Sequence, residues 1–223
     1  MPACANGSWA HDMTTNTAVD APLLVLDQLS KRYQRGWPRP RTTFSLDADM
    51  KFATPEIVGV LGPYGAGKTT LFEMIAGSCA PSAGRVVCAG QDIHRIRYDQ
   101  RDRLAIHYHQ SYQVRKRHYG TPSFLLDTAR SDYPRIHLFD EPQFNTQDGY
   151  IGFMLNFFRK LRGEGRLVFL CLHPTAQYHI AILQEICERF LFVADGRVSA
   201  APNIATLCAD ARVARYLGKL TPT

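Results

Sequence analysis

One glycine-rich stretch constrains the fold of this chain more than any other feature. It runs Gly62-Pro63-Tyr64-Gly65-Ala66-Gly67-Lys68-Thr69-Thr70 and fits the pattern G-x-x-x-x-G-K-[ST]. The stretch lies between a buried strand predicted over residues 56–61 and a helix predicted over residues 69–76. In that context the glycines let backbone N–H groups close around phosphates, and the helix N-terminus adds its positive dipole end. The motif therefore predicts a phosphate-binding loop in an α/β fold.

Side chains with phosphate and metal chemistry accompany this loop. Lys68 is expected to reach the β- and γ-phosphates of a nucleotide, and Thr69 to bind Mg²⁺. Asp140 and Glu141 end an apolar segment at residues 136–139, which suits one carboxylate to hold Mg²⁺ and the next to orient or deprotonate an attacking water. The chain has no N-K-x-D guanine signature, so a GTPase is disfavoured.

Short β-rich segments alternate with helical segments along the chain. This alternation predicts a mostly parallel sheet with flanking helices. The N-terminal part predicts two edge strands, at residues 23–26 and 44–50, with a loop between them. Further strands are expected at residues 85–88, 104–108, 135–139, 167–172 and 190–194, and helices at about residues 151–161 and 176–189. We expect a flexible leader over residues 1–21 and one domain over residues 22–223.

Composition limits the class of protein. Hydrophobic residues make up 45% of the chain and charged residues 21%, with a net charge of +6, which is outside the range of disordered chains. The longest apolar runs, at residues 167–172 and 190–194, are far shorter than the roughly 18 to 20 residues of a membrane-spanning helix. Six cysteines occur without a C-x-x-C pair, which predicts reduced thiols and a cytoplasmic location.

Three further landmarks stand in a definite order around the loop. Tyr33 ends the segment Leu-Ser-Lys-Arg-Tyr, Gln110 follows the predicted strand that ends near residue 108, and His173 follows the apolar run 167–172. Taken singly, each is more often an ordinary loop, surface or core residue. Together with the loop and with Asp140 and Glu141, their order resembles that of the ATP-binding cassette (ABC) ATPases over about residues 23–217.

The resemblance implies a function and a set of site residues. It implies an α/β P-loop fold with an N-terminal antiparallel part, and an ATP-binding, ATP-hydrolysing subunit of a membrane transporter with ATP and Mg²⁺ as cofactors. The implied sets are nucleotide-binding Tyr33, Gly62, Pro63, Tyr64, Gly65, Ala66, Gly67, Lys68, Thr69, Thr70 and Gln110, Mg²⁺-binding Thr69, Asp140 and Gln110, and catalytic Glu141, His173 and Lys68.

The implied partner is a transmembrane permease, and the chain itself is expected to be cytoplasmic and peripheral at the cytoplasmic face of the inner membrane. Membrane contact is expected only through that partner. Nucleic-acid binding is disfavoured, because the arginines at residues 95–103 do not interleave with aromatic residues.

The chain departs from the family pattern in its middle. The family carries an L-S-G-G-Q signature between Gln110 and Asp140, but this chain has no Gly-Gly pair, and residues 111–139 are several tens fewer than the family uses. We therefore expect a truncated helical subdomain and a dimer with a second, signature-bearing ABC ATPase. The alternative is a binding module that is regulated by ATP occupancy and rarely hydrolyses. Residues 144–148 resemble the family's D-loop with Gln143 as one extra residue, and Tyr64 stands where an asparagine is common.

Weaker signals have two interpretations each. The basic run at residues 115–118 could contact a membrane partner or anionic headgroups, but a solvated loop is favoured. His107 and His109 share one strand face, yet no third ligand is apparent, so a structural role is favoured over a zinc site. Residues 210–218 resemble the Tyr-Leu-Gly ending of lipopolysaccharide-export and branched-chain amino-acid-import ATPases, or form a terminal amphipathic helix with a glycine stop.

Overall fold

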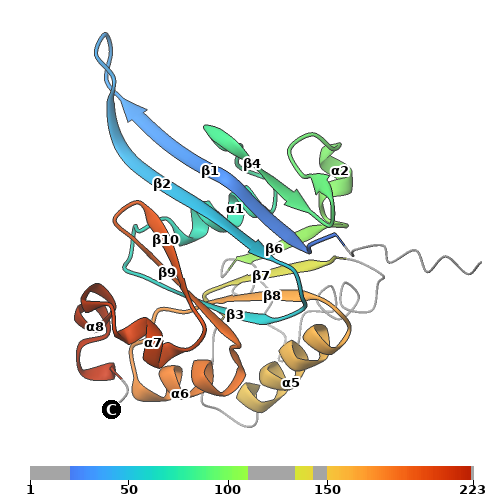
Figure 1. The fold of residues 1–223 in the computed structure, drawn as a ribbon, viewed down its shortest axis with the longest axis vertical. Coiled ribbons are helices and arrows are strands. Elements are labelled where there is room, and N and C mark those ends of the chain that lie inside the picture. The colour runs from blue at the N-terminus through green and yellow to red at the C-terminus, as the bar shows by residue number, and fades with distance from the viewer. Residues whose placement is uncertain (1–20, 110–133, 143–149, 222–223) are drawn as a thin grey trace, which may run out of the picture.

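A computed structural model describes residues 21–109, 134–142 and 150–221. Within these residues all strands join one ten-stranded sheet in the order β5-β4-β1-β2-β10-β9-β3-β8-β7-β6 (Figure 1). Outside the described part lie residues 1–20 of the leader predicted over residues 1–21, Gln110, the basic run 115–118, Gln143 and the D-loop-like residues 144–148.

The parallel half of the sheet forms the centre of the molecule. It contains β3 (Ile57–Leu61), β8 (Leu167–Cys171), β7 (Ile136–Asp140) and β6 (Ala105–His109), and β9 (Arg189–Ala194) pairs parallel to β3. Every residue of β3, β7 and β8 is buried, which explains their continuous apolar sequence. The carboxyl ends of these strands lie along the same edge of the sheet.

The antiparallel half is built on a long hairpin. Strands β1 (Leu24–Arg35) and β2 (Arg41–Phe52) pair with each other, and β4 (Ala83–Cys88) and β5 (Gln91–Asp92) extend the sheet beyond β1. Strand β10 (Arg197–Ala201) pairs antiparallel with β9 and meets β2 at a single parallel position, so it joins the two halves.

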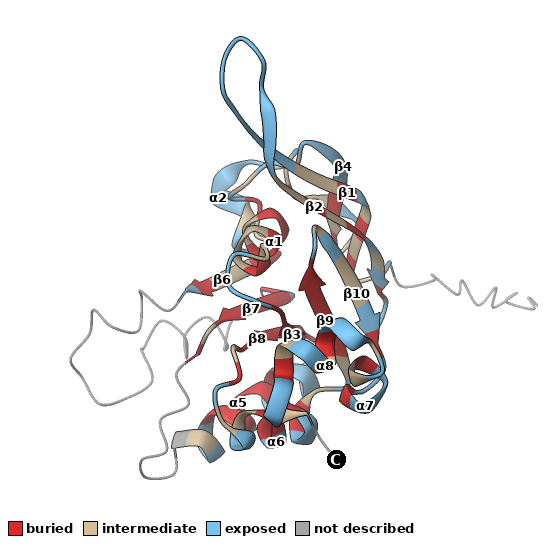
Figure 2. Cartoon of the chain, turned by 90° about the vertical axis from the view of Figure 1, so that its left-hand side faces the viewer, coloured by how far each residue is buried: buried red, intermediate tan, exposed pale blue. Residues whose placement is uncertain are grey.

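Helices cover the sheet in two layers. Helix α1 (Lys68–Ile75) lies between the antiparallel hairpin and the parallel strands, and its apolar side chains are fully buried there (Figures 1 and 2). The other main helices pack on the opposite face and enclose a second core. They are α5 (Tyr150–Gly163), α6 (Gln177–Ile186), α7 (Ile204–Cys208) and α8 (Ala211–Leu217), and the short elements α2 (Tyr98–Arg101) and η1 (Gly218–Leu220) complete the described part.

The structure confirms the α/β fold class, with a parallel core and an antiparallel N-terminal part. The prediction of edge strands at residues 23–26 and 44–50 is wrong, because β4 pairs with β1 and β10 pairs with β2, which places both strands inside the sheet. The predicted loop between them is also shorter, since β1 continues through Tyr33 to Arg35 and β2 begins at Arg41. In the described ranges no helix is both long and apolar enough to cross a membrane.

Candidate nucleotide-binding site

The glycine-rich loop connects β3 to α1, as the sequence predicts, and two of its glycines are required by close packing. Gly62 has φ of +150°, and a Cβ added there would lie 2.2 Å from the carbonyl oxygen of Val193. Gly67 has φ of +105°, and a Cβ there would lie 2.6 Å from the ring of Phe44. A side chain at either position would be strained and would press on its neighbour, so this loop conformation depends on both glycines.

Lys68 begins α1 and is held inside the loop. Its side chain is buried, and Nζ donates hydrogen bonds to the carbonyl oxygens of Gly62 at 2.7 Å and Pro63 at 2.9 Å. The ammonium group is thus fixed at the N-terminus of a helix, where the backbone also presents positive partial charge. This arrangement creates a compact cationic site.

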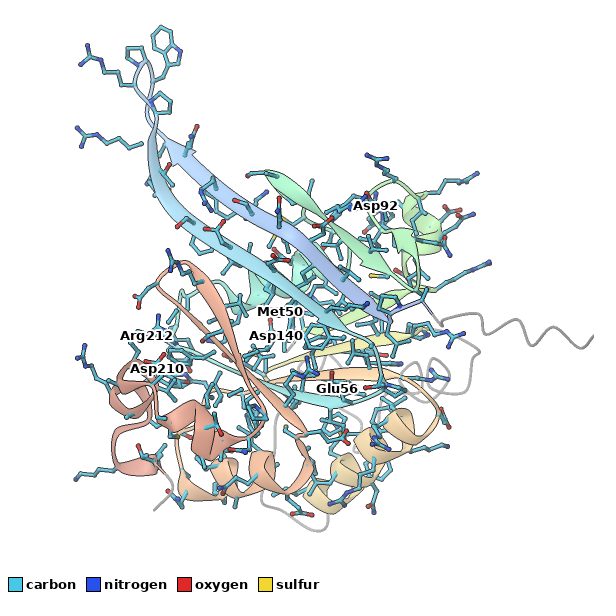
Figure 3. The ribbon with its side chains drawn as sticks, in the orientation of Figure 1. Met50, Glu56, Asp92, Asp140, Asp210 and Arg212 are labelled. Carbon is cyan, nitrogen blue, oxygen red and sulfur yellow. The ribbon has the colours of Figure 1, made fainter. Side chains whose placement is uncertain are left out.

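Thr69 and Asp140 meet across the carboxyl edge of the sheet. Asp140 is the last residue of β7, and Oγ1 of Thr69 donates a hydrogen bond of 2.8 Å to its Oδ2. Asp140 is 5% exposed and lies near the middle of the molecule (Figure 3). Burial alone raises the pKa of Asp140, but the nearby His107 imidazole and the hydrogen bond from Thr69 outweigh it, so the pKa lies below its ordinary value. The carboxylate is therefore ionised at neutral pH.

This pair fits Mg²⁺. Hydroxyl and carboxylate oxygens are the ligands that Mg²⁺ prefers, and it usually binds through one or two of them together with substrate phosphates. Gln110, the third predicted Mg²⁺ ligand, lies outside the described residues.

Two histidines of β6 approach the same carboxylate. Nε2 of His107 lies 3.4 Å from Oδ2 of Asp140, and Nε2 of His109 lies 4.0 Å from it. The register of β6 and β7, which pairs His109 with Asp140, brings this carboxylate to the two histidines, a proximity that the sequence alone did not indicate. In the described part of the chain no cluster of three His, Cys, Asp or Glu residues could hold a metal ion.

Glu141 and His173 lie on the loops that leave β7 and β8. The backbone N–H of Glu141 donates to the carbonyl oxygen of Cys171 at 3.0 Å, and its φ of +53° is unusual for a non-glycine residue. Burial and then the charge of Lys68 lower the pKa of His173, while Glu141 opposes them. Lys68, Glu141 and His173 are thus close enough to interact electrostatically, and the imidazole is neutral at neutral pH.

Tyrosines surround His173 on two sides. The ring of Tyr64, in the glycine-rich loop, lies 3.9 Å from the His173 ring between centroids, and Nζ of Lys68 lies 5.8 Å from the Tyr64 ring. The hydroxyl of Tyr216, on α8, lies 3.1 Å from Nδ1 of His173. Tyr216 was not among the predicted site residues. The Tyr-Leu-Gly ending around it was the only sequence signal, and that pattern suggests no role for the hydroxyl.

Tyr33 lies beside the start of α1. Its ring packs at 5.5 Å against Phe44, the residue that contacts Gly67, and its hydroxyl lies 3.6 Å from Sγ of Cys79. The hydrogen bond with Cys79 and burial raise the pKa of Tyr33, while a hydrogen bond with Thr70 lowers it. The side chain is 41% exposed, so part of its ring remains open to a planar ligand. The structure therefore brings Tyr33 close to the glycine-rich loop, and its stacking on adenine stays a prediction.

Comparisons with known proteins agree with this geometry. The family model described as "ABC transporter" matches residues 46–122. The arabinose import ATP-binding protein AraG 2 of Burkholderia cenocepacia is 23% identical over 94% of this chain and 48% of its own length. The lipopolysaccharide export system ATP-binding protein LptB of Acidithiobacillus ferridurans is 36% identical over 39% of this chain and 33% of its own. The chain thus spans half or less of the length of these relatives.

Solved structures show the same fold. A nucleotide-free ATP-binding cassette from an ABC transporter superposes with a TM-score of 0.63 at 14% identity, covering 88% of this chain and 98% of that one. An ATP-binding cassette dimer bound to ADP and Pi gives a TM-score of 0.59 at 16% identity, covering 80% and 98%. The family match over residues 46–122, the relatives and the shared fold thus all show that this chain is similar to the ATP-binding cassette ATPases.

Proposed function

We propose that this chain binds and hydrolyses Mg-ATP as the ATP-binding subunit of an ABC-type membrane transporter. One observation carries the proposal: Lys68, Thr69 and Asp140 converge at the carboxyl edge of the sheet, where Thr69 and Asp140 are 2.8 Å apart. A cation, a metal-binding hydroxyl and a metal-binding carboxylate are the groups that a nucleoside triphosphate with Mg²⁺ requires.

The loop would hold the phosphates. Backbone N–H groups of residues 62–70 would surround the β-phosphate, and Lys68 would exchange its carbonyl partners for β- and γ-phosphate oxygens. Thr69 and Asp140, with Gln110 as a further candidate, would hold Mg²⁺, which neutralises charge on the β- and γ-phosphates when bound. Tyr33 would stack on the adenine ring.

Glu141 and His173 would support hydrolysis. Glu141 directly follows the Mg²⁺-binding carboxylate, so its side chain is suited to orient the attacking water and accept a proton from it. His173, neutral and close to Lys68, would donate a hydrogen bond to the γ-phosphate. The retention of both side chains favours catalysis over simple nucleotide binding.

Relatives supply the proposed context. AraG 2 and LptB are named as ATP-binding proteins of import and export systems, which suggests a permease partner for this chain at the cytoplasmic face of a membrane. Because the chain has no Gly-Gly pair to form the family signature, we propose that a second, signature-bearing ABC ATPase completes the γ-phosphate site in trans. The missing signature also favours a second candidate, a module whose ATP occupancy regulates assembly with little turnover.

Equilibrium binding of Mg-ATP to the purified full chain tests the nucleotide site. Lys68→Ala should abolish binding, because the buried cation of the loop is lost. Lys160→Ala is the matched control, since this lysine is 63% exposed on α5 and should bind ATP like the wild type. Equal affinity of the wild type and Lys68→Ala would remove the loop from its proposed role.

Affinity capture tests the partners. The Glu141→Gln chain, held in its ATP-bound state, would be captured from detergent-solubilised cells with Mg-ATP and its partners identified by mass spectrometry. A multi-spanning membrane protein together with an ATPase that carries L-S-G-G-Q supports the transporter. Recovery of soluble proteins alone, or of no partner, supports the regulatory module.

A further inference from the structure

The outer end of the β1–β2 hairpin projects from the body of the molecule (Figures 1 and 2). We call residues 35–41, Arg35-Gly36-Trp37-Pro38-Arg39-Pro40-Arg41, the hairpin tip. Strand β4 pairs with β1 only as far as Ser30, and β10 pairs with β2 only at Asp47. Tyr33 and Phe44 still contact Cys79 and Gly67 beyond those positions. From there to the tip the hairpin is a two-stranded ribbon for which the described residues show no contact with another element, and such a ribbon has little stability of its own.

Trp37 is the most exposed large apolar side chain of the described residues. Its exposed fraction is 93%. Tryptophan carries a large apolar area, so full exposure is unfavourable unless a partner covers the ring. Its place at the end of a projecting ribbon lets it reach a surface that the body of the protein does not touch.

The hairpin tip is also cationic. Arg35, Arg39 and Arg41 are all exposed, and in the described residues no carboxylate is recorded within ion-pair distance of them. From Lys31 to Leu46 the sequence contains no Asp or Glu at all. Three unpaired guanidinium groups around one indole thus form a surface that is complementary to an anionic partner.

We propose that the hairpin tip binds an anionic phospholipid surface, with Trp37 at the headgroup level and the three arginines on lipid phosphates. An indole is favourable at that level because one end is apolar and its N–H is polar, and guanidinium groups pair well with phosphates. Single-stranded nucleic acid fits less well, because binding it needs several aromatic side chains along a groove, whereas the tip has one. This proposal goes beyond the transporter function and replaces the sequence expectation that membrane contact comes only through a partner.

The contact is weak by itself. Each arginine near an anionic surface strengthens binding by a factor of about five, which corresponds to about 1 kcal/mol. Three arginines with one tryptophan therefore give reversible binding to the lipid surface. Stable membrane anchoring generally needs two attachments, so the hairpin tip would add to a second attachment of the protein.

Vesicle binding tests the proposal on the full chain without nucleotide. The chain has two tryptophans, so a Trp9→Phe background makes Trp37 the only one. Titration with phosphatidylglycerol-containing vesicles should shift its emission to the blue, and brominated lipids should quench it. Pure phosphatidylcholine vesicles should give neither change. Absence of a shift with anionic vesicles, or an equal shift with both kinds, overturns the proposal.

Charge variants separate the hairpin tip from general attraction of a basic protein. The affinity for the same anionic vesicles, measured by sedimentation, should fall about 100-fold in the triple variant Arg35→Ser, Arg39→Ser, Arg41→Ser, because each of the three arginines contributes a factor of about five. The matched control, with serine at the exposed Arg95, Arg97 and Arg103, carries the same charge change on another face and should bind within about threefold of the wild type. Equal loss in both variants overturns the proposal.

Two further readouts complete the test. Mg-ATP binding should be unchanged in the triple tip variant, which would show that this variant is folded. A chain that does not bind Mg-ATP should still bind the vesicles, so the two proposals can fail separately. Tip-dependent binding to single-stranded DNA or RNA, without binding to vesicles, would assign the tip to nucleic acid and overturn the lipid proposal.

Discussion

The hydroxyl of Tyr216 lies 3.1 Å from Nδ1 of His173 and links the C-terminal helix α8 to the loop after β8. A hydrogen bond from the Gly62 backbone acts on the same phenol and opposes the rise in the pKa of Tyr216 that burial causes. The O–H of Tyr216 can donate to Nδ1, and this would leave the proton of the neutral imidazole on Nε2, as a donor to the γ-phosphate requires.

Removing this hydroxyl tests its positioning role. Tyr216→Phe keeps the ring but loses the hydrogen bond, which is worth about 1 kcal/mol, so we expect kcat to fall about threefold to tenfold with KM unchanged. The matched control Tyr178→Phe changes a half-exposed tyrosine on α6 that contacts His179, and should leave both constants unchanged. A rise in KM with unaltered kcat would contradict the assignment.

The Mg²⁺ pair predicts a specific metal dependence. Asp140→Asn removes the buried carboxylate that accepts from Thr69, so the Mg²⁺ concentration for half-maximal ATPase activity should rise by at least about tenfold. Asp99→Asn is the control, because Asp99 is 63% exposed and pairs only with Arg97 in the described structure. An unchanged Mg²⁺ titration for Asp140→Asn would exclude this carboxylate from metal binding.

Gly62 should tolerate no side chain. The Cβ of Gly62→Ala would meet the Val193 carbonyl oxygen at 2.2 Å, so we expect a loss of about 2 kcal/mol or more in the free energy of unfolding. Gly152→Ala provides the contrast, since that glycine lies in helix α5 with no atom within 4 Å of a new Cβ, and should stabilise the protein by up to about 1 kcal/mol. Denaturant unfolding measures both, and equal effects would mean that the loop can relax.

A buried histidine predicts how stability depends on pH. His137 is fully buried in β7, with Nδ1 3.0 Å from the Tyr108 hydroxyl and Nε2 3.4 Å from Arg166. Burial and then the Arg166 charge lower the pKa of His137 to about 3, against about 6.5 in the unfolded chain. Between these two values only the unfolded state binds the proton, so stability falls as the pH decreases from 7 to 5, by about 2 kcal/mol.

The variant His137→Asn isolates this contribution. Asparagine keeps a polar group near the place of the imidazole Nδ1 but does not titrate. The free energy of unfolding of the variant should therefore change by about 2 kcal/mol less than that of the wild type between pH 7 and pH 5. Chemical denaturation at the two pH values gives the comparison. Parallel pH profiles for the two proteins would show that another group titrates on unfolding.

The parts of the site that the sequence could predict are local. Gly62, Gly67 and Lys68 belong to one continuous motif, and Asp140 follows a run of apolar residues whose burial is evident from its composition. Their chemistry follows from residue type and from the parallel strands that align them. The structure places these residues together at the carboxyl edge of the sheet, and their roles stay predictions.

The features that the sequence did not predict depend on contacts between segments that are distant along the chain. Tyr216 reaches His173 only because α8 folds back over the end of β8, and His107 reaches Asp140 only through the pairing of β6 with β7. The turn residues Gly36, Pro38 and Pro40 predicted a loop, but the strand pairing continues close to the tip, so the extended hairpin was not foreseen. These features follow from packing, which local patterns do not specify.

Single-turnover release of phosphate from Mg-ATP, measured on wild-type and Glu141→Gln chains, tests the proposed catalysis most directly. The proposed roles predict that the wild type releases phosphate when the signature-bearing partner is present, while Glu141→Gln binds ATP equally well and releases none. Equal phosphate release by the two proteins, or none from the wild type with its partner, would contradict an ATPase built on Lys68, Asp140 and Glu141.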